Sequence, residues 1–522
     1  MQPASRRLYL ERSRTAFYYV AMCRYILLCL AFLLISGCAT MPETRLPVPN
    51  NASEGAVLVR FLPNTESAST FMKNWQSVVV QQESTAADQP GPTFAMKPDL
   101  SGTSRSATYM AALPPGRYRF VEFSSYSCGL VCISERIRVN EKFSRFEVRP
   151  QQLTDLGVII QTPDTRERSV LLAHVASDDN QLVDEMIREM APALVPMLDK
   201  PKAGWSADTV PEQMPLLAEF SKRVSHGFVQ PREAAPGQFI FGTANGALGI
   251  WAAGERAEGQ FDLGVHRSVE TVLVTSGGAW LAGGELSLLM QSDDQGKHWR
   301  SMRGNLPLAL VLDLHEWKGN ILATLVRGTQ VEVYSATSGT SEWRRLGQYR
   351  TEFNLFWDIP GVYPRSLLID DHLLVAVPSR QLAALNLITG VSELRDLPGG
   401  MAVLSASDDK ILRCKCIRGI IVNPWESADM GKTWTPSTVP RFIQEPAFRD
   451  RMHGVAYEGG VISSGKLVRT EDGGKTWTPS IDIAFPISRL FYQRDRSAVY
   501  AATPYGSVWQ SKDDGQTWGR VR

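Results

Sequence analysis

The chain has almost no net charge and few cysteines, and it lacks several common catalytic signatures. Lys and Arg number 55 against 54 Asp and Glu, for a net charge of +1, so the composition offers no electrostatic case for nucleic-acid binding. The seven histidines are scattered, and neither H-E-x-x-H nor G-x-S-x-G occurs, so neither a zinc-protease nor a serine-hydrolase signature is present. We therefore predict neither a metal site nor a cofactor.

Length and composition predict a folded protein with more than one domain. A chain of 522 residues exceeds the size at which a single hydrophobic core keeps growing. Hydrophobic residues make up 43% and charged residues 21%, which supplies enough apolar material for real cores and argues against disorder over most of the length. At least two folded units are expected.

The N-terminus follows the pattern of a secretion signal. A basic segment precedes an apolar run over residues 26–35, and the small residues Ser36 and Gly37 precede Cys38. The run is too short for a stable transmembrane helix and fits the apolar core of a signal peptide, with a short membrane anchor or a buried helix as the structural alternative. The segment resembles the bacterial lipoprotein lipobox, in which the cysteine is acylated and becomes the new N-terminus.

This resemblance implies a bacterial envelope protein that is anchored to the membrane by lipid on Cys38. It implies a signal peptide at 1–37, followed by a proline-containing tether at 38–54. An aspartate after the cysteine would resemble the inner-membrane retention signal of enteric bacteria, so Ala39 at that position favours the outer membrane. The basic segment is unusually long if translation starts at Met1, and a start at Met22 is left open.

Four cysteines besides Cys38 remain after cleavage, and their even number in an oxidising periplasm suggests disulfides. Three pairings are possible, and we favour Cys128 with Cys132, closing a hairpin between two strand-like runs. Cys414 and Cys416 lie two apart on a strand, where a mutual disulfide is expected to be strained. A zinc site is the alternative, although the spacing lacks the C-x₂-C pairs typical of structural zinc.

Residues 55–163 carry short strand-like runs separated by turn signals. Within them, residues 113–120 place a Pro-Pro-Gly turn before an alternating strand. This segment resembles the corresponding part of small prealbumin-like or carboxypeptidase-regulatory-like β-sandwiches of bacterial lipoproteins. A β-sandwich is therefore expected, serving either as a binding module or as a spacer between the membrane and the rest of the chain.

Residues 164–229 change to a helical pattern. Leu182, Met186 and Met190 recur at helical spacing after the cap candidates Ser177 and Asp178. A methionine-rich stripe at this spacing is more often core than a cofactor site. We predict a helical connector that packs on one or both neighbouring domains.

The second half of the chain contains four copies of the pattern Ser/Thr-x-Asp-x-Gly-x-x-Trp. The Asp carboxylate can accept hydrogen bonds from backbone N–H groups of a tight turn, the Gly supplies a positive φ, and the Trp packs on a neighbouring element. The pattern thus predicts structural hairpin turns and not an active site. The copies comprise Ser292, Asp294, Gly296 and Trp299; Ser427, Asp429, Gly431 and Trp434; Thr470, Asp472, Gly474 and Trp477; and Ser511, Asp513, Gly515 and Trp518.

The spacing of the copies predicts a repeat architecture. They begin at positions 292, 427, 470 and 511, so two gaps are 43 and 41 residues while the first is 135. The long gap is expected to hold two decayed repeats, near 335–343 and 386–390, and a further repeat is expected near 249. Seven units of four short strands over 230–522 predict a mainly β chain that ends in a β-propeller, with seven blades favoured over six or eight.

The motif resembles the Asp-box, or BNR, repeat of sialidase-like β-propellers, and the repeat region is about equally similar to photosystem II assembly factors, which act as binding platforms. The sialidase resemblance implies an anion-binding site of three arginines at the propeller centre, with Arg365, Arg451 and Arg489 as candidates. However, the chain lacks the [Phe/Tyr]-Arg-Ile-Pro motif that such enzymes carry ahead of the first box.

Three further residues are candidates for acid or base chemistry near the inner strand of the third repeat: Asp313, His315 and Glu316. Because a fold does not determine a function, we assign no catalytic residue and expect a propeller that binds a protein partner or a cell-wall glycan in a scaffold or assembly role. The alternative is a sialidase-like glycoside hydrolase or a carbohydrate-binding protein. The third and fourth repeats, with the insertion at 347–364, are the expected partner site.

Overall fold

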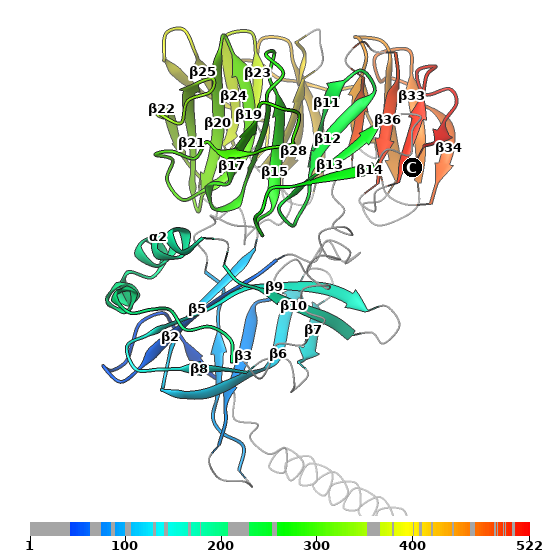
Figure 1. Ribbon diagram of the computed structural model, residues 1–522. Coiled ribbons are helices and arrows are strands. Elements are labelled where there is room, and N and C mark those ends of the chain that lie inside the picture. The colour runs from blue at the N-terminus through cyan, green and yellow to red at the C-terminus, as the bar shows by residue number, and fades with distance from the viewer. Residues whose placement is uncertain are drawn as a thin grey trace, which may run out of the picture. The chain divides into compact units, whose positions relative to one another are not determined.

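A computed structural model gives the structure of the chain (Figure 1). It divides into two compact units, Met1–Glu43 and Thr44–Arg522. The predicted signal peptide and Cys38 lie outside the described residues. The structure describes residues 42–62, 75–84, 89–99, 106–128, 132–139, 145–164, 169–177, 179–206, 229–252, 258–351, 366–377, 380–399, 401–406, 410–418, 421–440, 443–459, 465–484, 487, 489–493, 495, 497–503 and 507–521.

Two sheets form the N-terminal part of the second unit and share one hydrophobic core. Aromatic side chains dominate this core, and the Phe61 ring meets Tyr109 and Phe123 edge to face at centroid distances of 5.3 and 4.9 Å. One sheet contains β1 (Glu43–Arg45), β3 (Ser77–Gln82), β4 (Thr93–Met96), β6 (Gly116–Cys128), β7 (Cys132–Arg138) and β8 (Arg145–Val148). The other has the order β10 (Ser169–Val175), β9 (Leu153–Asp164), β2 (Gly55–Phe61) and β5 (Ala107–Leu113).

A helix covers the second face of β2, which explains why every residue of that strand is buried. Helix α2 (Asn180–Met190) begins after Asp179, whose carboxylate accepts the N–H of Gln181 at 2.8 Å. Its buried stripe packs on Ala56 and Leu58 of β2, and the 3₁₀ segment η1 (Pro192–Asp199) extends the same cluster. The stripe comprises Leu182, Val183, Met186 and Ile187.

The range 164–229, predicted as a helical connector, also contains a strand. Strand β10 pairs along its whole length with β9, and Ala203 and Trp205 make isolated bridges to Thr154 and Phe146. The Trp205 ring stacks on His174 at a centroid distance of 4.3 Å. Residues as far as Trp205 therefore pair with the two-sheet core and do not simply link it to the repeats.

Seven four-stranded antiparallel sheets follow in chain order, each a simple meander. We number them sheets 1 to 7 in chain order. Sheet 1 contains β11 (Val229–Ala235), β12 (Gln238–Gly242), β13 (Ala247–Ala252) and β14 (Glu258–Asp262); sheet 2 contains β15 (Val269–Val274), β16 (Trp280–Gly284), β17 (Leu289–Ser292) and β18 (Arg300–Ser301); sheet 3 contains β19 (Leu310–Trp317), β20 (Asn320–Arg327), β21 (Gln330–Thr337) and β22 (Arg344–Arg350); and sheet 4 contains β23 (Ser366–Ile369), β24 (His372–Val377), β25 (Gln381–Asn386) and β26 (Ser392–Asp396). Sheet 5 contains β27 (Met401–Ala406), β28 (Leu412–Arg418), β29 (Ile421–Ser427) and β30 (Thr435–Pro436); sheet 6 contains β31 (Ile443–Phe448), β32 (Gly454–Gly459), β33 (Gly465–Thr470) and β34 (Thr478–Ile483); and sheet 7 contains β35 (Arg489–Tyr492), β36 (Val499–Ala502), β37 (Val508–Ser511) and β38 (Gly519–Arg520). The predicted mainly β fold is confirmed.

Each sheet packs on the next, and the last packs on the first. Apolar clusters join sheets 1 to 2, 2 to 3, 3 to 4, 4 to 5 and 6 to 7, while the Arg413 guanidinium lies 4.0 Å from the Phe448 ring between sheets 5 and 6. Phe239 and Trp251 of sheet 1 then pack on Tyr500 of sheet 7. The seven sheets therefore close into a ring, which leaves no open sheet face at either end of the series.

Candidate functional site

The four sequence motifs form one repeated turn between the third and fourth strands of sheets 2, 5, 6 and 7. In every copy the first hydroxyl accepts the Gly N–H at 2.7–2.9 Å and donates to the Asp carboxylate at 2.7–2.8 Å. In each copy the same carboxylate also accepts, at 2.9 Å, the N–H of the residue four positions after the Asp. The glycine φ lies between 81° and 89°, a left-handed conformation that suits glycine.

In each of these turns, the Asp carboxylate accepts several hydrogen bonds from groups of the same turn. The Thr476 hydroxyl donates to Asp472 at 2.6 Å and, together with the Thr476 N–H, lowers the pKa of Asp472 from 3.8 to about 2. Thr517 acts on Asp513 in the same way and lowers its pKa to about 2. Each carboxylate is therefore ionised near neutral pH and committed to its own turn. This geometry suits a structural role and not a reaction with a substrate.

The three candidate arginines are not brought together where the structure describes them. Arg365 lies outside the described residues. Arg451 is exposed in the turn after β31, whereas Arg489 is the first residue of β35. Because the sheets repeat one meander around the ring, their first strands all run in the same direction. Arg451 follows the end of one such strand, and Arg489 is at the start of the next. The two arginines therefore lie toward opposite faces of the ring.

The acid and base candidates of β19 tie neighbouring sheets together. The Asp313 carboxylate, only 3% exposed, accepts the N–H of Ser366 in sheet 4 at 2.7 Å. The Glu316 carboxylate accepts the N–H and the hydroxyl of Ser276 in sheet 2, at 2.6 and 2.7 Å. Each carboxylate thus accepts a hydrogen bond from a backbone N–H group of the neighbouring sheet. These bonds between sheets are a sufficient structural reason for the two acidic residues.

His315 and Ser366 meet beside Asp313, but their arrangement does not activate a nucleophile. The Ser366 hydroxyl lies 3.0 Å from His315 Nε2 and accepts a hydrogen bond from Thr324 at 2.8 Å. The carboxylate of Asp313 contacts Ser366, whereas a nucleophile relay would place it on the far nitrogen of the histidine. Burial, reinforced by Arg232 and opposed by Asp313, lowers the pKa of His315 to about 4, so the ring is neutral near pH 7.

Three exposed apolar side chains lie in the turn between β25 and β26 and on β26, the outer strand of sheet 4. They are Ile388, Val391 and Leu394, which are 64%, 64% and 54% exposed, and we call them together the edge strip. The turn that carries two of them is held by Asn386, whose side-chain oxygen accepts the N–H groups of Ile388 and Thr389 at 3.0 Å. The apolar side chains are therefore presented by an ordered turn.

The sequence placed the expected partner site in the third and fourth repeats, and the edge strip belongs to the fourth sheet. Most of the insertion at 347–364 lies outside the described residues, which resume at Ser366 after Thr351. The strip residues themselves were missed. The available signal was the presence of Ile388 and Val391 in a turn, where polar residues are usual.

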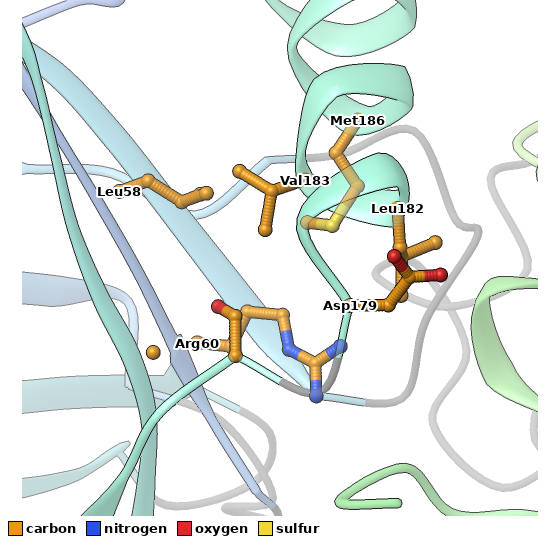
Figure 2. Close-up of a pocket in the computed structure, with 8 residues that line it drawn as sticks. Leu58, Arg60, Asp179, Leu182, Val183 and Met186 are labelled. Atoms are coloured by element: carbon orange, nitrogen blue, oxygen red, sulfur yellow. The ribbon is translucent and has the colours of Figure 1, made fainter. Parts of the chain in front are cut away.

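A small cavity lies between β2 and the start of α2. Figure 2 shows Arg60 and Asp179 at this cavity, beside Leu58, Val183 and Met186. It has room for little more than one water molecule. The cavity is therefore too small for an organic ligand.

One prediction about the cysteines is wrong, the one that concerned Cys414 and Cys416. Cys414 and Cys416 form a disulfide, although strain was expected to disfavour it. Their Cα atoms are 5.3 Å apart, within the range that a disulfide spans, so the strand geometry permits the bond. A zinc site using all four thiolates is inconsistent with this bond. Cys128 and Cys132 are register partners in the β6–β7 hairpin, and their predicted bridge stays a prediction.

In the part of the chain that the structure describes, no helix is both long and apolar enough to span a membrane. Among those same residues, no cluster of three or more His, Cys, Asp or Glu is arranged to hold a metal ion.

No protein-family model matches the chain, and no curated protein matches its sequence. Similar solved structures include YCF48 bound to a D1 peptide, with 12% identity over 56% of this chain and 95% of that one, at a TM-score of 0.45. Sqt1 of Saccharomyces cerevisiae has 12% identity over 57% and 85%, at a TM-score of 0.40. BamB from Moraxella catarrhalis has 14% identity over 53% and 80%, at a TM-score of 0.31. The functional inference below is based on the chain's own residues.

Proposed function

We propose that the chain is a lipid-anchored protein of the bacterial envelope whose seven-bladed, Asp-box β-propeller binds a protein partner. The edge strip carries this proposal. Three large apolar side chains more than half exposed, within one turn and its following strand, are unusual on a soluble surface and typical of an interaction site. The two-sheet N-terminal domain, which we assign to the prealbumin-like β-sandwiches, then serves as the spacer between lipid and propeller.

Binding is favoured over catalysis by the contacts of the other candidates. A sialidase-like centre needs arginines that converge on one carboxylate of the substrate, and Arg451 and Arg489 lie toward opposite faces of the ring. The carboxylates of Asp313 and Glu316 hold backbone N–H groups of neighbouring sheets. The apolar side chains of the turn are exposed although its backbone is ordered by Asn386, which is why we place the function there.

Binding of a protein partner is tested by affinity capture from cell envelopes with the lipidated protein and two matched variants. Leu394→Glu places a charge on the edge strip and is expected to lower the recovered partner at least tenfold, about 1.4 kcal/mol of binding free energy. Met452→Glu is the control, because Met452 is 46% exposed on sheet 6, away from the strip. A stoichiometric protein recovered with wild type and Met452→Glu but lost with Leu394→Glu supports the proposal. Equal recovery with all three proteins contradicts it.

The lipid anchor is tested separately at Cys38. Wild type is expected to incorporate an alkyne-tagged palmitate and to sediment with outer membranes, whereas Cys38→Ala is expected to lose the label. The physical reason is that an acylated cysteine is the expected membrane contact, since the chain has a net charge of only +1. Label incorporation by Cys38→Ala at the wild-type level would show that this residue does not carry the lipid.

A further inference from the structure

Two apolar side chains are exposed where the chain enters the two-sheet domain. Leu46 and Val48 directly follow β1 and are 60% and 56% exposed. Among the residues of this domain whose side chains the structure describes, they are the only exposed large apolar ones. They belong to the sequence Leu-Pro-Val-Pro at 46–49, which we call the entry segment. Large apolar side chains so close together on a surface indicate a contact outside the domain.

The backbone of the entry segment is fixed by the domain. The Leu46 carbonyl accepts the N–H of Ala112 in β5 at 2.9 Å. Arg45 forms an ion pair with Glu54 at 3.0 Å, and the second oxygen of Glu54 accepts the N–H of Asn50 at 2.8 Å. The Glu54 side chain is only 3% exposed, so these bonds lie within the domain. Because the two apolar side chains are presented by an ordered backbone, a contact there costs little conformational entropy.

The composition of the entry segment suits an apolar environment. Pro47 and Pro49 have no N–H group, and the Leu46 carbonyl and the Asn50 N–H are already paired within the domain. Few backbone groups therefore lose hydrogen bonds to water when the segment enters lipid. Residues 46–53 also contain no charged side chain, so no ion has to be desolvated.

The length of chain before the domain places the entry segment beside the proposed lipid anchor. Strand β1 begins at Glu43, five residues after Cys38, and five extended residues span at most about 18 Å. Acyl chains on Cys38 would lie in the hydrocarbon of the bilayer, so the first strand of the domain is held within this distance of the membrane surface. The membrane is therefore present at the segment at a high effective concentration, and a small apolar contact is enough for binding.

We infer that Leu46 and Val48 insert into the membrane interface beside the lipid on Cys38, so that the N-terminal domain contacts the bilayer at a second point. Apolar side chains in such a contact reach about 5–10 Å into the boundary between headgroups and acyl chains. The inference rests on the proposed lipid anchor and adds a lipid-binding surface to it. With the lipid alone the domain would rotate about a short link, whereas a second contact restricts that rotation.

The test places a fluorescent reporter in the entry segment of the lipidated protein. Leu46→Trp is reconstituted in phosphatidylcholine vesicles whose acyl chains are either plain or brominated, and its added fluorescence is the difference from wild type. Because bromine quenches indole on contact, we expect a blue-shifted emission and a loss of about half of the added fluorescence. The matched reporter is Met452→Trp on sheet 6, where the native side chain is 46% exposed, and we expect no quenching of it.

A second substitution tests the insertion itself. Adding Val48→Glu to Leu46→Trp places a charge in the segment and is expected to abolish most of the quenching, whereas adding Met452→Glu is expected to leave it unchanged. No quenching of Leu46→Trp, equal quenching of both reporters, or quenching that Val48→Glu leaves intact would overturn the inference.

Other occupants of the entry segment give different results. A soluble chain that begins at residue 38 and carries Cys38→Ala is the reference without lipid. A blue shift of Leu46→Trp in that chain that grows with protein concentration would overturn the inference in favour of a second copy. A shift that needs a soluble envelope extract would overturn it in favour of a protein partner. If Cys38 takes up no palmitate label, the proposed anchor fails and this inference with it, whereas labelled but unquenched Leu46→Trp leaves the anchor standing and contradicts the inference alone.

Discussion

Replacing Phe239 by alanine is expected to lower the free energy of unfolding of the ring by about 3–5 kcal/mol. Phe239 is 2% exposed and contacts Trp251, Phe491 and Tyr500 at ring-centroid distances of 5.5, 5.2 and 5.0 Å. Two of these rings belong to sheet 7, so the side chain joins the first and last sheets. Urea unfolding followed by tryptophan fluorescence measures the loss, and limited proteolysis reports whether sheets 1 and 7 open.

A phenylalanine in the N-terminal core provides the matched control. Phe94 of β4 is 4% exposed, and Phe94→Ala is expected to cost a similar free energy without adding cleavage sites in sheets 1 and 7. The ring-closure interpretation predicts early cleavage in those sheets for Phe239→Ala only. A loss below about 1 kcal/mol, or identical cleavage patterns for the two variants, would show that Phe239 does not hold the ring closed.

The repeats could be located from sequence because each motif is a local structure. The hydroxyl, carboxylate and glycine of a copy lie within four residues and bond to one another, so the pattern places the turn after the third strand directly. Spacing alone also identified sheets 3 and 4, which lack the motif. The spacing predicts four short strands in each unit but not where each strand begins and ends, as in β35 to β38 of the last sheet. These ends depend on packing between sheets, which a local pattern does not contain.

Contacts between distant residues could not be predicted. Asp313 and Ser366 are 53 positions apart, and Ser276 and Glu316 are 40 apart, so the structural use of these carboxylates is invisible along the chain. Strand β10 was missed because a short apolar run is ambiguous until its pairing with β9 is known. Likewise, the resemblance implied that Arg451 and Arg489 meet at the propeller centre, and only their positions after β31 and at the start of β35 separate them.

The free energy of unfolding is expected to fall as the pH is lowered from about 6.5 to 4, because His315 stays neutral in the folded protein. Burial lowers its pKa from 6.5 to about 4, so in this range the unfolded chain takes up a proton that the folded ring does not. The stability due to neutral His315 is complete above pH 6.5 and is lost progressively toward pH 4. A shift of this size corresponds to roughly 3 kcal/mol at most.

Variants at one hydrogen-bonded cluster separate this titration from the loss of a contact. His315→Gln is expected to flatten the pH dependence between 7.5 and 4.5, measured by urea unfolding at each pH, whatever its effect on stability at pH 7.5. Thr324→Val removes the 2.8 Å hydrogen bond to Ser366 but keeps the histidine, so it should lower stability and retain the wild-type slope. His174, whose burial also lowers its pKa to about 4, supplies a second, separate part of the slope in both variants. A wild-type slope in His315→Gln would mean that this histidine is not neutral in the folded ring at mildly acidic pH.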